Sequence, residues 1–375
     1  MTALKVIAGM AIVLATAGSV TATLVTPRGN SWGLRVAILV NRSVRLVCVA
    51  IARPIRSYKR KDAVLATMAP VALLGQLAVF LGMFLVGYAI ALSGYTSSFG
   101  GALKLSASQL FTAGLAHVGG PGNSALEVLA AVTGAVTIAL QIGYLPVIYQ
   151  AFNRRESLVT LMESRAGIPA WGPELLVRHQ LVASLDVLPS LYRDWETWSA
   201  DLAESHVSYP ILLYFRSPEP GYSFVLALLA VLDAAALQLA LMPTSAPTEA
   251  RFCLRMGFTA LRRIAQVLGW TFDPDPHPDS GLQLTYEEFA YAVDLISNAG
   301  IPLERTAEEA WPHFQGWRVN YESLAYRLAD RVVAPRAPWS GDRRHLSEEL
   351  ILPNRPPHRS PGGGTTDETR FRPSE

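Results

Sequence analysis

Two long apolar segments separated by a short polar piece constrain this chain more than any other feature. The first runs from Ala63 to about Ser93 and contains no charged residue, and the second runs from Ser124 to Tyr149 and contains one, Glu127. About 20 apolar residues cross the hydrocarbon core of a bilayer, so both segments are long enough to span it. Residues 103–123 (LKLSASQLFTAGLAHVGGPGN) are too short and too polar to cross alone. We therefore predict two membrane spans joined by a segment that does not span.

A third apolar segment, from Val6 to Val25, precedes a strongly basic stretch. Residues 27–62 contain nine Arg and Lys but a single acid, Asp62. Basic residues near spans mark the cytoplasmic side, which predicts three spans with the N-terminus and residues 94–123 outside. The alternative is a signal peptide cleaved after the small residues at 15–17 (Ala-Thr-Ala). Cleavage there would place the basic stretch outside, against the charge bias.

The arginines of the basic stretch recur at helical spacing. They occur in steps of 7, 3, 8 and 3 residues, at Arg35, Arg42, Arg45, Arg53 and Arg56. At 3.6 residues per turn these positions share one face, which predicts an interfacial helix with its charges toward lipid headgroups or water. A voltage-sensor helix also carries arginines at steps of three, but here the series is interrupted and no acidic partner helix precedes it.

The polar piece between the two long spans has the order of a pore loop. Residues 103–111 predict a short helix, which is followed by a Thr-x-Gly turn and, after a few residues, by Pro121. The polar positions of this helix are Ser106, Ser108 and Gln109, and the turn reads Thr112-Ala113-Gly114-Leu115-Ala116-His117. The whole order over residues 63–153 resembles the pore module of two-span bacterial potassium channels and their relatives.

The resemblance implies roles for the matching residues. In that family the turn reads TVGYGD, and its backbone carbonyls and Thr hydroxyl replace the hydration shell of the ion. The implied ion pathway here is Thr112, Ala113, Gly114, Leu115 and Ala116. Gly134, near the middle of the second span, is the implied gating hinge. One pore loop cannot enclose an ion, so the resemblance also implies a homotetramer.

The turn departs from the family pattern at three positions. Ala116 replaces the second glycine, Leu115 the aromatic residue and His117 the acid. Alanine at positive φ costs roughly 1 kcal/mol or more, so potassium selectivity does not follow from the resemblance. His117 and Glu127 fall at the expected outer mouth. They either set the local ion concentration and pH response or form a solvated rim.

Three further polar side chains lie in the predicted spans, and they face either a pore or a neighbouring helix. They are Gln76, Thr137 and Gln141. Polar groups inside membranes usually face protein, which favours helix–helix contacts.

The remainder of the chain predicts a cytoplasmic helical domain, residues 154–333, and a disordered tail, residues 334–375. Residues 224–242 are apolar enough to span, but a span here would place the following arginines outside. We therefore predict a buried central helix in which Asp233 pairs with an arginine of the next helix, residues 249–268. Trp195 and Trp198 are predicted to lie on a buried stripe.

Several function classes receive no support. We find no glycine-rich nucleotide fingerprint and no nucleophile–base or paired-carboxylate constellation, so we predict neither an enzyme nor a cofactor. The acidic run at residues 273–281 lacks the glycine and the final Glu of a calcium loop, and we predict no metal site. Cys48 and Cys253 suggest no disulfide framework.

The combined prediction is an all-α protein of the bacterial inner membrane. It has membrane helices with a re-entrant pore helix and loop, then a cytoplasmic bundle and a disordered tail. The predicted regions are residues 1–62, 63–153, 154–333 and 334–375. We expect a cation-conducting, channel-like protein that contacts lipid, monovalent cations with potassium as one candidate, and a cytoplasmic protein, but no nucleic acid. The alternative is a non-conducting, membrane-anchored scaffold or sensor.

Overall fold

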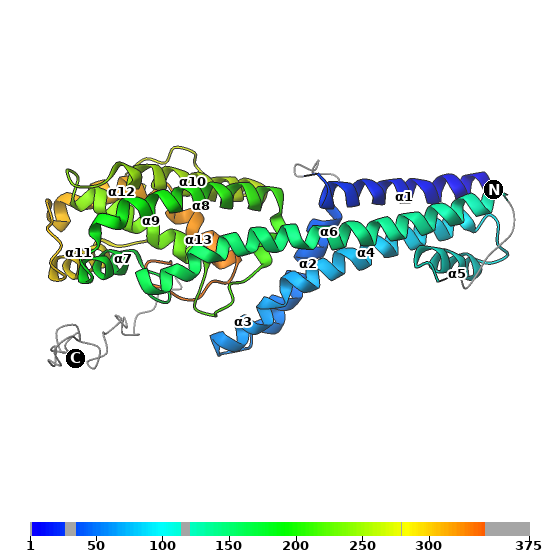
Figure 1. Cartoon of the computed structure of the whole chain (residues 1–375), viewed down its shortest axis with the longest axis horizontal. Helices are drawn as coiled ribbons and strands as arrows, with labels where there is room; N and C mark the ends of the chain where they lie inside the picture. Colours follow the sequence, from blue (N-terminus) through cyan, green and yellow to red (C-terminus); the bar gives the residue numbers. More distant parts are fainter. Residues whose placement is uncertain (1, 27–34, 114–120, 279, 342–375) are drawn as a thin grey trace. The chain divides into compact units, whose positions relative to one another are not determined.

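The computed structural model describes all residues except 1, 27–34, 114–120, 279 and 342–375. The described residues confirm the all-α prediction, because they form helices and no strand (Figure 1). In chain order the elements are α1 (Thr2–Leu24), α2 (Arg35–Ala52), α3 (Tyr58–Ala66), α4 (Met68–Leu92), α5 (Phe99–Leu110), α6 (Pro121–Ala166), α7 (Gly172–Leu181), η1 (Leu185–Val187), α8 (Leu188–Ser208), η2 (Pro210–Tyr214), α9 (Phe224–Leu241), α10 (Thr248–Val267), α11 (Tyr286–Asn298), α12 (Ala307–Arg318) and α13 (Glu322–Arg331).

The chain divides into two compact units. The first contains residues 1–152 and 208–216, and the second contains residues 153–207 and 217–375. Helix α6 continues from the first unit into the second, because the division falls between Phe152 and Asn153.

Four helices are long and apolar enough to cross a membrane, which supports a membrane protein. Three belong wholly or partly to the first unit: Thr2–Leu24, Tyr58–Leu92 and Ser124–Ala166. The fourth, Phe224–Leu241, is α9, and every one of its residues is buried within the second unit. Its apolar side chains therefore have protein neighbours and need no lipid, and the prediction that this helix is buried is confirmed.

In the first unit α1 runs antiparallel to α4 at very close range. Lys5 Nζ donates to the carbonyl of Ser93 at 3.2 Å, so the start of α1 lies beside the end of α4. Further along, a Cβ added at Gly9 would lie 2.4 Å from the carbonyl oxygen of Gly87. Small residues allow helix backbones to approach in this way inside membranes.

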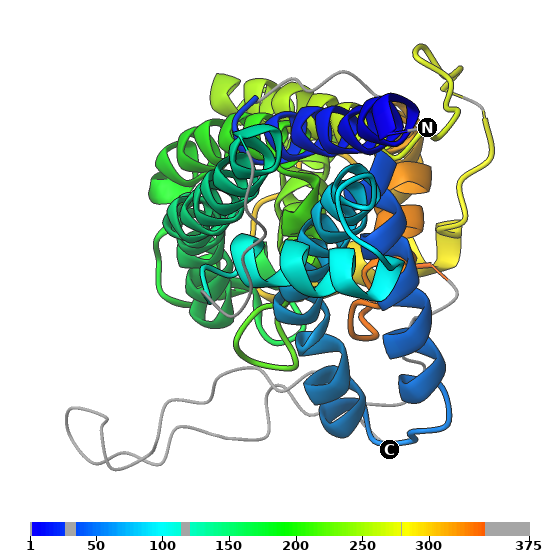
Figure 2. The same cartoon turned by 90° about the vertical axis from the view of Figure 1, so that its right-hand side faces the viewer.

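The prediction of one continuous arginine-bearing helix through Arg56 is wrong. Helix α2 ends at Ala52, so Arg53 and Arg56 lie beyond it in the turn that leads to α3. The reason is Pro54, which lacks an amide N–H and disfavours helical conformation in the residue before it. Helices α2 and α3 therefore form a hairpin, and Figure 2 shows the two side by side and joined by a short turn.

Residues 208–216 return from α8 to pack within the first unit. Tyr209 contacts Tyr144 with ring centroids 5.9 Å apart, and Phe215 contacts Phe152 at 5.3 Å. Arg216 Nε lies 2.5 Å from Asp62 Oδ1, and both side chains are largely buried. These contacts attach the segment both to the end of α6 that leaves this unit and to α3.

The second unit is centred on α9 and a buried ion network. Arg318 of α12 is fully buried, pairs with Asp233 and donates to Glu322 Oε1 at 3.0 Å. It also donates to Tyr326 at 2.7 Å. The prediction that Asp233 pairs with an arginine of residues 249–268 is therefore wrong. Burial of the Asp233 carboxylate requires a cationic partner, and this partner comes from α12 instead of residues 249–268.

The aromatic prediction for α8 is confirmed, whereas the predicted start of the tail is wrong. Trp195 and Trp198 are buried, with ring centroids 4.5 Å apart. Ala337 and Trp339, which were assigned to the disordered tail, are buried, and the Trp339 carbonyl accepts from Arg318 at 3.0 Å. The packed region therefore continues to Gly341, and residues 342–375 lie outside the described part.

Candidate pore site

Helix α5 starts beside the end of α4 and runs back along it. Its first turn is capped by Ser98, whose Oγ accepts from Gly101 N at 3.1 Å. It is one turn longer at its start than predicted, Phe99–Leu110 instead of residues 103–111. Figures 1 and 2 both show α5 next to α4, and the two helices pack together.

The far end of α5 lies well away from the ends of the two long helices. The carbonyl of Leu110 faces Gly134, which follows the start of α6 by 13 residues, or about 20 Å at the rise of an α-helix. Phe111 lies beside Leu81 and Leu85 of α4, roughly 10–16 Å from the end of α4 at Leu92. If α4 and α6 cross a hydrocarbon core about 30 Å thick, this position of the end of α5 corresponds to the middle of that core.

The polar side chains of α5 fasten it to both neighbours. Ser106 is fully buried and its Oγ donates to the carbonyl of Leu85 in α4 at 2.9 Å. Gln109 Nε2 lies 3.4 Å from Glu127 Oε2 in α6. Ser108 is also buried. The polar positions predicted for a pore helix thus hold α5 in its slot.

Glu127 is buried, with 4% of its surface exposed. The alternative of a solvated rim does not fit this residue, because its side chain is buried and contacts Gln109. An acid buried at the depth of a span is costly and is a candidate functional group. It lies beside Gln109 of α5.

The end of α5 has a strained but fully hydrogen-bonded turn. Thr112 N donates to Gln109 O at 2.9 Å, and Ala113 N donates to Ser108 O at 2.8 Å. This pair of bonds is the Schellman arrangement, which needs a left-handed residue. Thr112 fills that position with φ +51°, although a β-branched residue there is a genuine outlier. Strain of this kind concentrates at functional sites.

Gly134 has a structural reason to be glycine. A Cβ at this position would lie 2.0 Å from the carbonyl oxygen of Leu110, which is far inside contact distance. The glycine lets α6 pass directly against the end of α5. The sequence could identify Gly134 only by its place in the span, because this contact depends on the packing. In contrast, Pro146 interrupts the hydrogen bonding of α6 itself.

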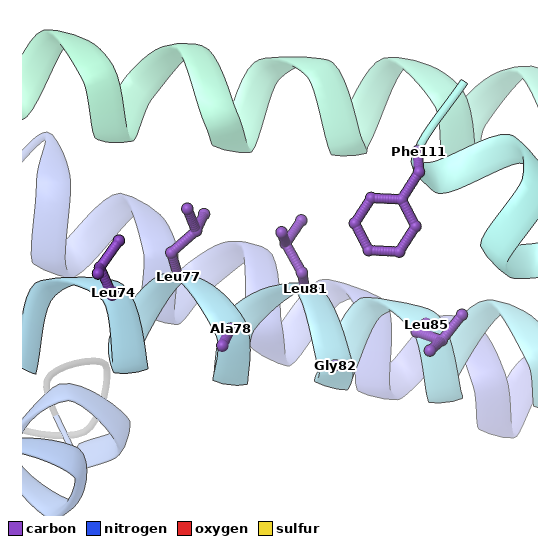
Figure 3. Close-up of a pocket in the computed structure, with 7 residues that line it drawn as sticks. All are labelled: Leu74, Leu77, Ala78, Leu81, Gly82, Leu85 and Phe111. Carbon is purple, nitrogen blue, oxygen red and sulfur yellow. The ribbon is translucent and has the colours of Figure 1, made fainter. Parts of the chain in front are cut away.

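An apolar groove of about 420 Å³ lies next to the end of α5. Figure 3 shows Leu77 and Leu81 directed from α4 toward α6, with Phe111 at one end of the groove. The remaining lining comes from Leu74, Ala78, Gly82 and Leu85. The groove is therefore hydrophobic throughout, and it adjoins the turn that begins the predicted ion pathway.

The predicted site is only partly described. Thr112 and Ala113 are exposed at the end of α5, whereas Gly114, Leu115, Ala116 and His117 lie outside the described residues. Their geometry stays a prediction.

Of the three other polar residues predicted in the spans, one joins two helices. Gln76 Nε2 donates to Asn41 Oδ1 at 2.7 Å, which links α4 to α2. Thr137 donates to the carbonyl of Thr133 within α6 at 2.7 Å. Gln141 is buried, and its Oε1 has no hydrogen-bond partner in the described part of the chain. Sequence reasoning missed Tyr88, whose hydroxyl lies 2.7 Å from Thr133 Oγ1 and ties α4 to α6.

Comparison with protein-family models, curated proteins and solved structures found no match.

The second unit offers a pocket of about 300 Å³ near the ends of α6 and α7. Arg178 and His179 line it, but Arg178 is paired with Glu174 and also donates to the carbonyl of Glu163 at 3.3 Å. Burial lowers the pKa of His179, which favours its neutral form. Within the described ranges no three His, Cys, Asp or Glu side chains are grouped to hold a metal.

Proposed function

We propose that this chain is one subunit of a cation-conducting, pore-loop membrane protein resembling bacterial potassium channels. The observation that carries the proposal is the position of α5, which enters beside α4 and ends near mid-depth against Gly134. Non-helical backbone at such depth is tolerated where it is enclosed by protein or lines a water-filled cavity.

The direction of α5 favours cations over anions. The C-terminal end of a helix carries a partial negative charge of about half an elementary charge. Here that end lies at Leu110, which is buried, and Phe111, which is half-exposed. The buried carboxylate of Glu127, beside Gln109, would add negative charge near the same end of α5. A cation near Thr112 would therefore be stabilised by the helix end, while an anion would be repelled.

A single chain contributes one such helix end, so a closed pore requires several copies around an axis. Four copies follow from the family resemblance and from closed cyclic symmetry. The eroded pattern at Leu115, Ala116 and His117 leads us to propose a pore that passes monovalent cations without strict potassium selectivity.

The three-span orientation is supported by the ends of α1 and α4. Thr2 Oγ1 lies 3.4 Å from the carbonyl of Gly94, beside the Lys5–Ser93 contact. The N-terminus and the α4–α5 connection therefore share one side, as the charge distribution requires. The inner bacterial membrane, with the second unit in the cytoplasm, is the location we propose.

Cation flux in proteoliposomes tests the function. Full-length protein is reconstituted with a thallium- or potassium-sensitive dye inside, and Gly114→Pro is compared with Gly143→Ala. A Cβ at Gly143 meets nothing within 4 Å, so that variant controls for a glycine change in α6. We expect flux in wild type and in the control, and its loss in Gly114→Pro.

Absence of flux in all three proteins, together with a monodisperse monomer, would favour the rival function. In that case the chain is a membrane-anchored scaffold or sensor.

A further inference from the structure

The tip of the α2–α3 hairpin gathers basic side chains that lack protein counterions. Between the end of α2 and the first turn of α3 the chain contains five basic residues, and four of them are exposed. They are Arg53, Arg56, Lys59, Arg60 and Lys61. In the described part of the chain, none of these five side chains forms a hydrogen bond or an ion pair.

The one acid of this region, Asp62, is already paired. Asp62 is buried and its Oδ1 accepts from Arg216 Nε at 2.5 Å, while another nitrogen of Arg216 donates to Tyr58 at 2.7 Å. Arg216 comes from the returning segment 208–216. Because Asp62 is neutralised by a residue from outside the hairpin, the positive charges of the tip are left uncompensated.

Helix α2 has the inverted pattern of a lipid-facing helix. Its packed face consists of small or polar residues, whereas its large apolar side chains are exposed, with Leu39 67% and Leu46 65% exposed. The packed residues are Ala37, Asn41, Cys48 and Ala52. A helix that turns large apolar residues outward fits the boundary between acyl chains and headgroups.

The tip also lies at headgroup depth. The helical stretch Tyr58–Leu92 is 35 residues long, and Lys59 to Lys61 lie 31 to 33 residues before its end. A rise of 1.5 Å per residue and a tilt of about 20° give about 44–47 Å. A bilayer with its headgroups is about 40–45 Å thick. If Leu92 lies at the outer surface of one headgroup layer, the tip reaches the outer surface of the opposite headgroup layer.

We propose that the tip of the α2–α3 hairpin binds the phosphate headgroups of anionic phospholipids in the inner leaflet. Exposed bases without counterions supply the attraction, and the apolar face of α2 places them beside the lipid. The ion pair between Arg216 and Asp62 has a second consequence, because it keeps the single carboxylate out of this surface. The inference does not depend on conduction and would hold equally for a scaffold.

The test compares lipid association of the full chain in proteoliposomes. Spin-labelled phosphatidylglycerol and phosphatidylcholine are each added, and the motionally restricted fraction gives their relative association. The variant Lys59→Gln/Arg60→Gln/Lys61→Gln is compared with Arg251→Gln/Arg255→Gln/Arg263→Gln, three exposed bases of α10. Wild type and the α10 control should prefer phosphatidylglycerol roughly threefold or more, and the preference should fall at high salt.

The triple variant at the tip should lose most of the preference while keeping its elution volume in detergent. An unchanged preference in that variant would overturn the proposal, and so would equal association of both lipids with wild type. Displacement of the lipid by millimolar glycerophosphoglycerol would also overturn it, because it would identify a site for a soluble phosphate. Arg216→Gln provides an independent variant, and a reduced preference there is expected because Asp62 becomes an uncompensated acid.

Discussion

Replacing Gly134 by alanine should loosen α5, because the two helices touch at this residue. The added Cβ would lie 2.0 Å from the carbonyl oxygen of Leu110, whereas ordinary contact begins near 3.4 Å. The end of α5 must therefore retreat by more than 1 Å. Overpacking of this kind costs about 1–3 kcal/mol.

Gly143→Ala is the matched control, since it lies on the same helix and its Cβ would meet nothing within 4 Å. Both variants gain the same helix propensity, up to about 1 kcal/mol. The difference between them therefore isolates the clash with Leu110. We expect Gly143→Ala to be neutral or slightly stabilising and Gly134→Ala to be less stable by about 1–3 kcal/mol.

Hydrogen exchange of the full chain in lipid nanodiscs measures this difference locally. Peptides that cover residues 101–110 should exchange roughly 5- to 150-fold faster in Gly134→Ala than in Gly143→Ala. Equal protection of α5 in the two variants would refute the packing argument. A change in flux without a change in exchange of α5 would instead support a hinge at Gly134.

Three further outcomes follow from the described side chains. Burial raises the pKa of Asp233 to about 6, so the folded state holds this proton more tightly than the unfolded chain. The free energy of unfolding of the full chain, measured in urea, should accordingly decrease by up to about 3 kcal/mol as pH rises from about 4 to about 6. Asp233→Asn should remove this pH dependence. Asp62→Arg and Arg216→Asp should each increase the hydrogen exchange of residues 208–216. The double variant should recover about 1–3 kcal/mol as the coupling energy of the pair, and purely additive effects would contradict the ion pair. Thr112→Gly should relieve left-handed strain and protect α5 further by about 1 kcal/mol, and weaker protection would show that the threonine side chain is needed.

The sequence was sufficient for the elements that depend on composition. The uncharged run of α4 and the apolar start of α6 predict spans whatever their neighbours are. The arginines after residue 250 correctly predicted that α9 is buried, because a fourth span would have placed them outside. The short polar helix α5 could also be predicted, since its length excludes a span.

The contacts between particular helices could not be predicted in the same way. Burial of Asp233 demands some cation, but the sequence does not say that α12 brings Arg318 to it from 85 residues away. The close approach at Gly134 and the left-handed turn at Thr112 likewise depend on how α5 seats between its neighbours. Pro54 was the one local signal that could have ended α2 at the correct residue.

The re-entrant position proposed for α5 is tested most directly by the depth of its two ends in the bilayer. Spin labels at Phe99→Cys and Phe111→Cys, both half-exposed positions, report depth through their relative accessibility to oxygen and to a polar nickel chelate. A re-entrant helix of 12 residues predicts that the label at residue 111 lies about 10 Å or more deeper in the bilayer than the label at residue 99. Two labels at the same depth, both near the headgroups, would contradict it.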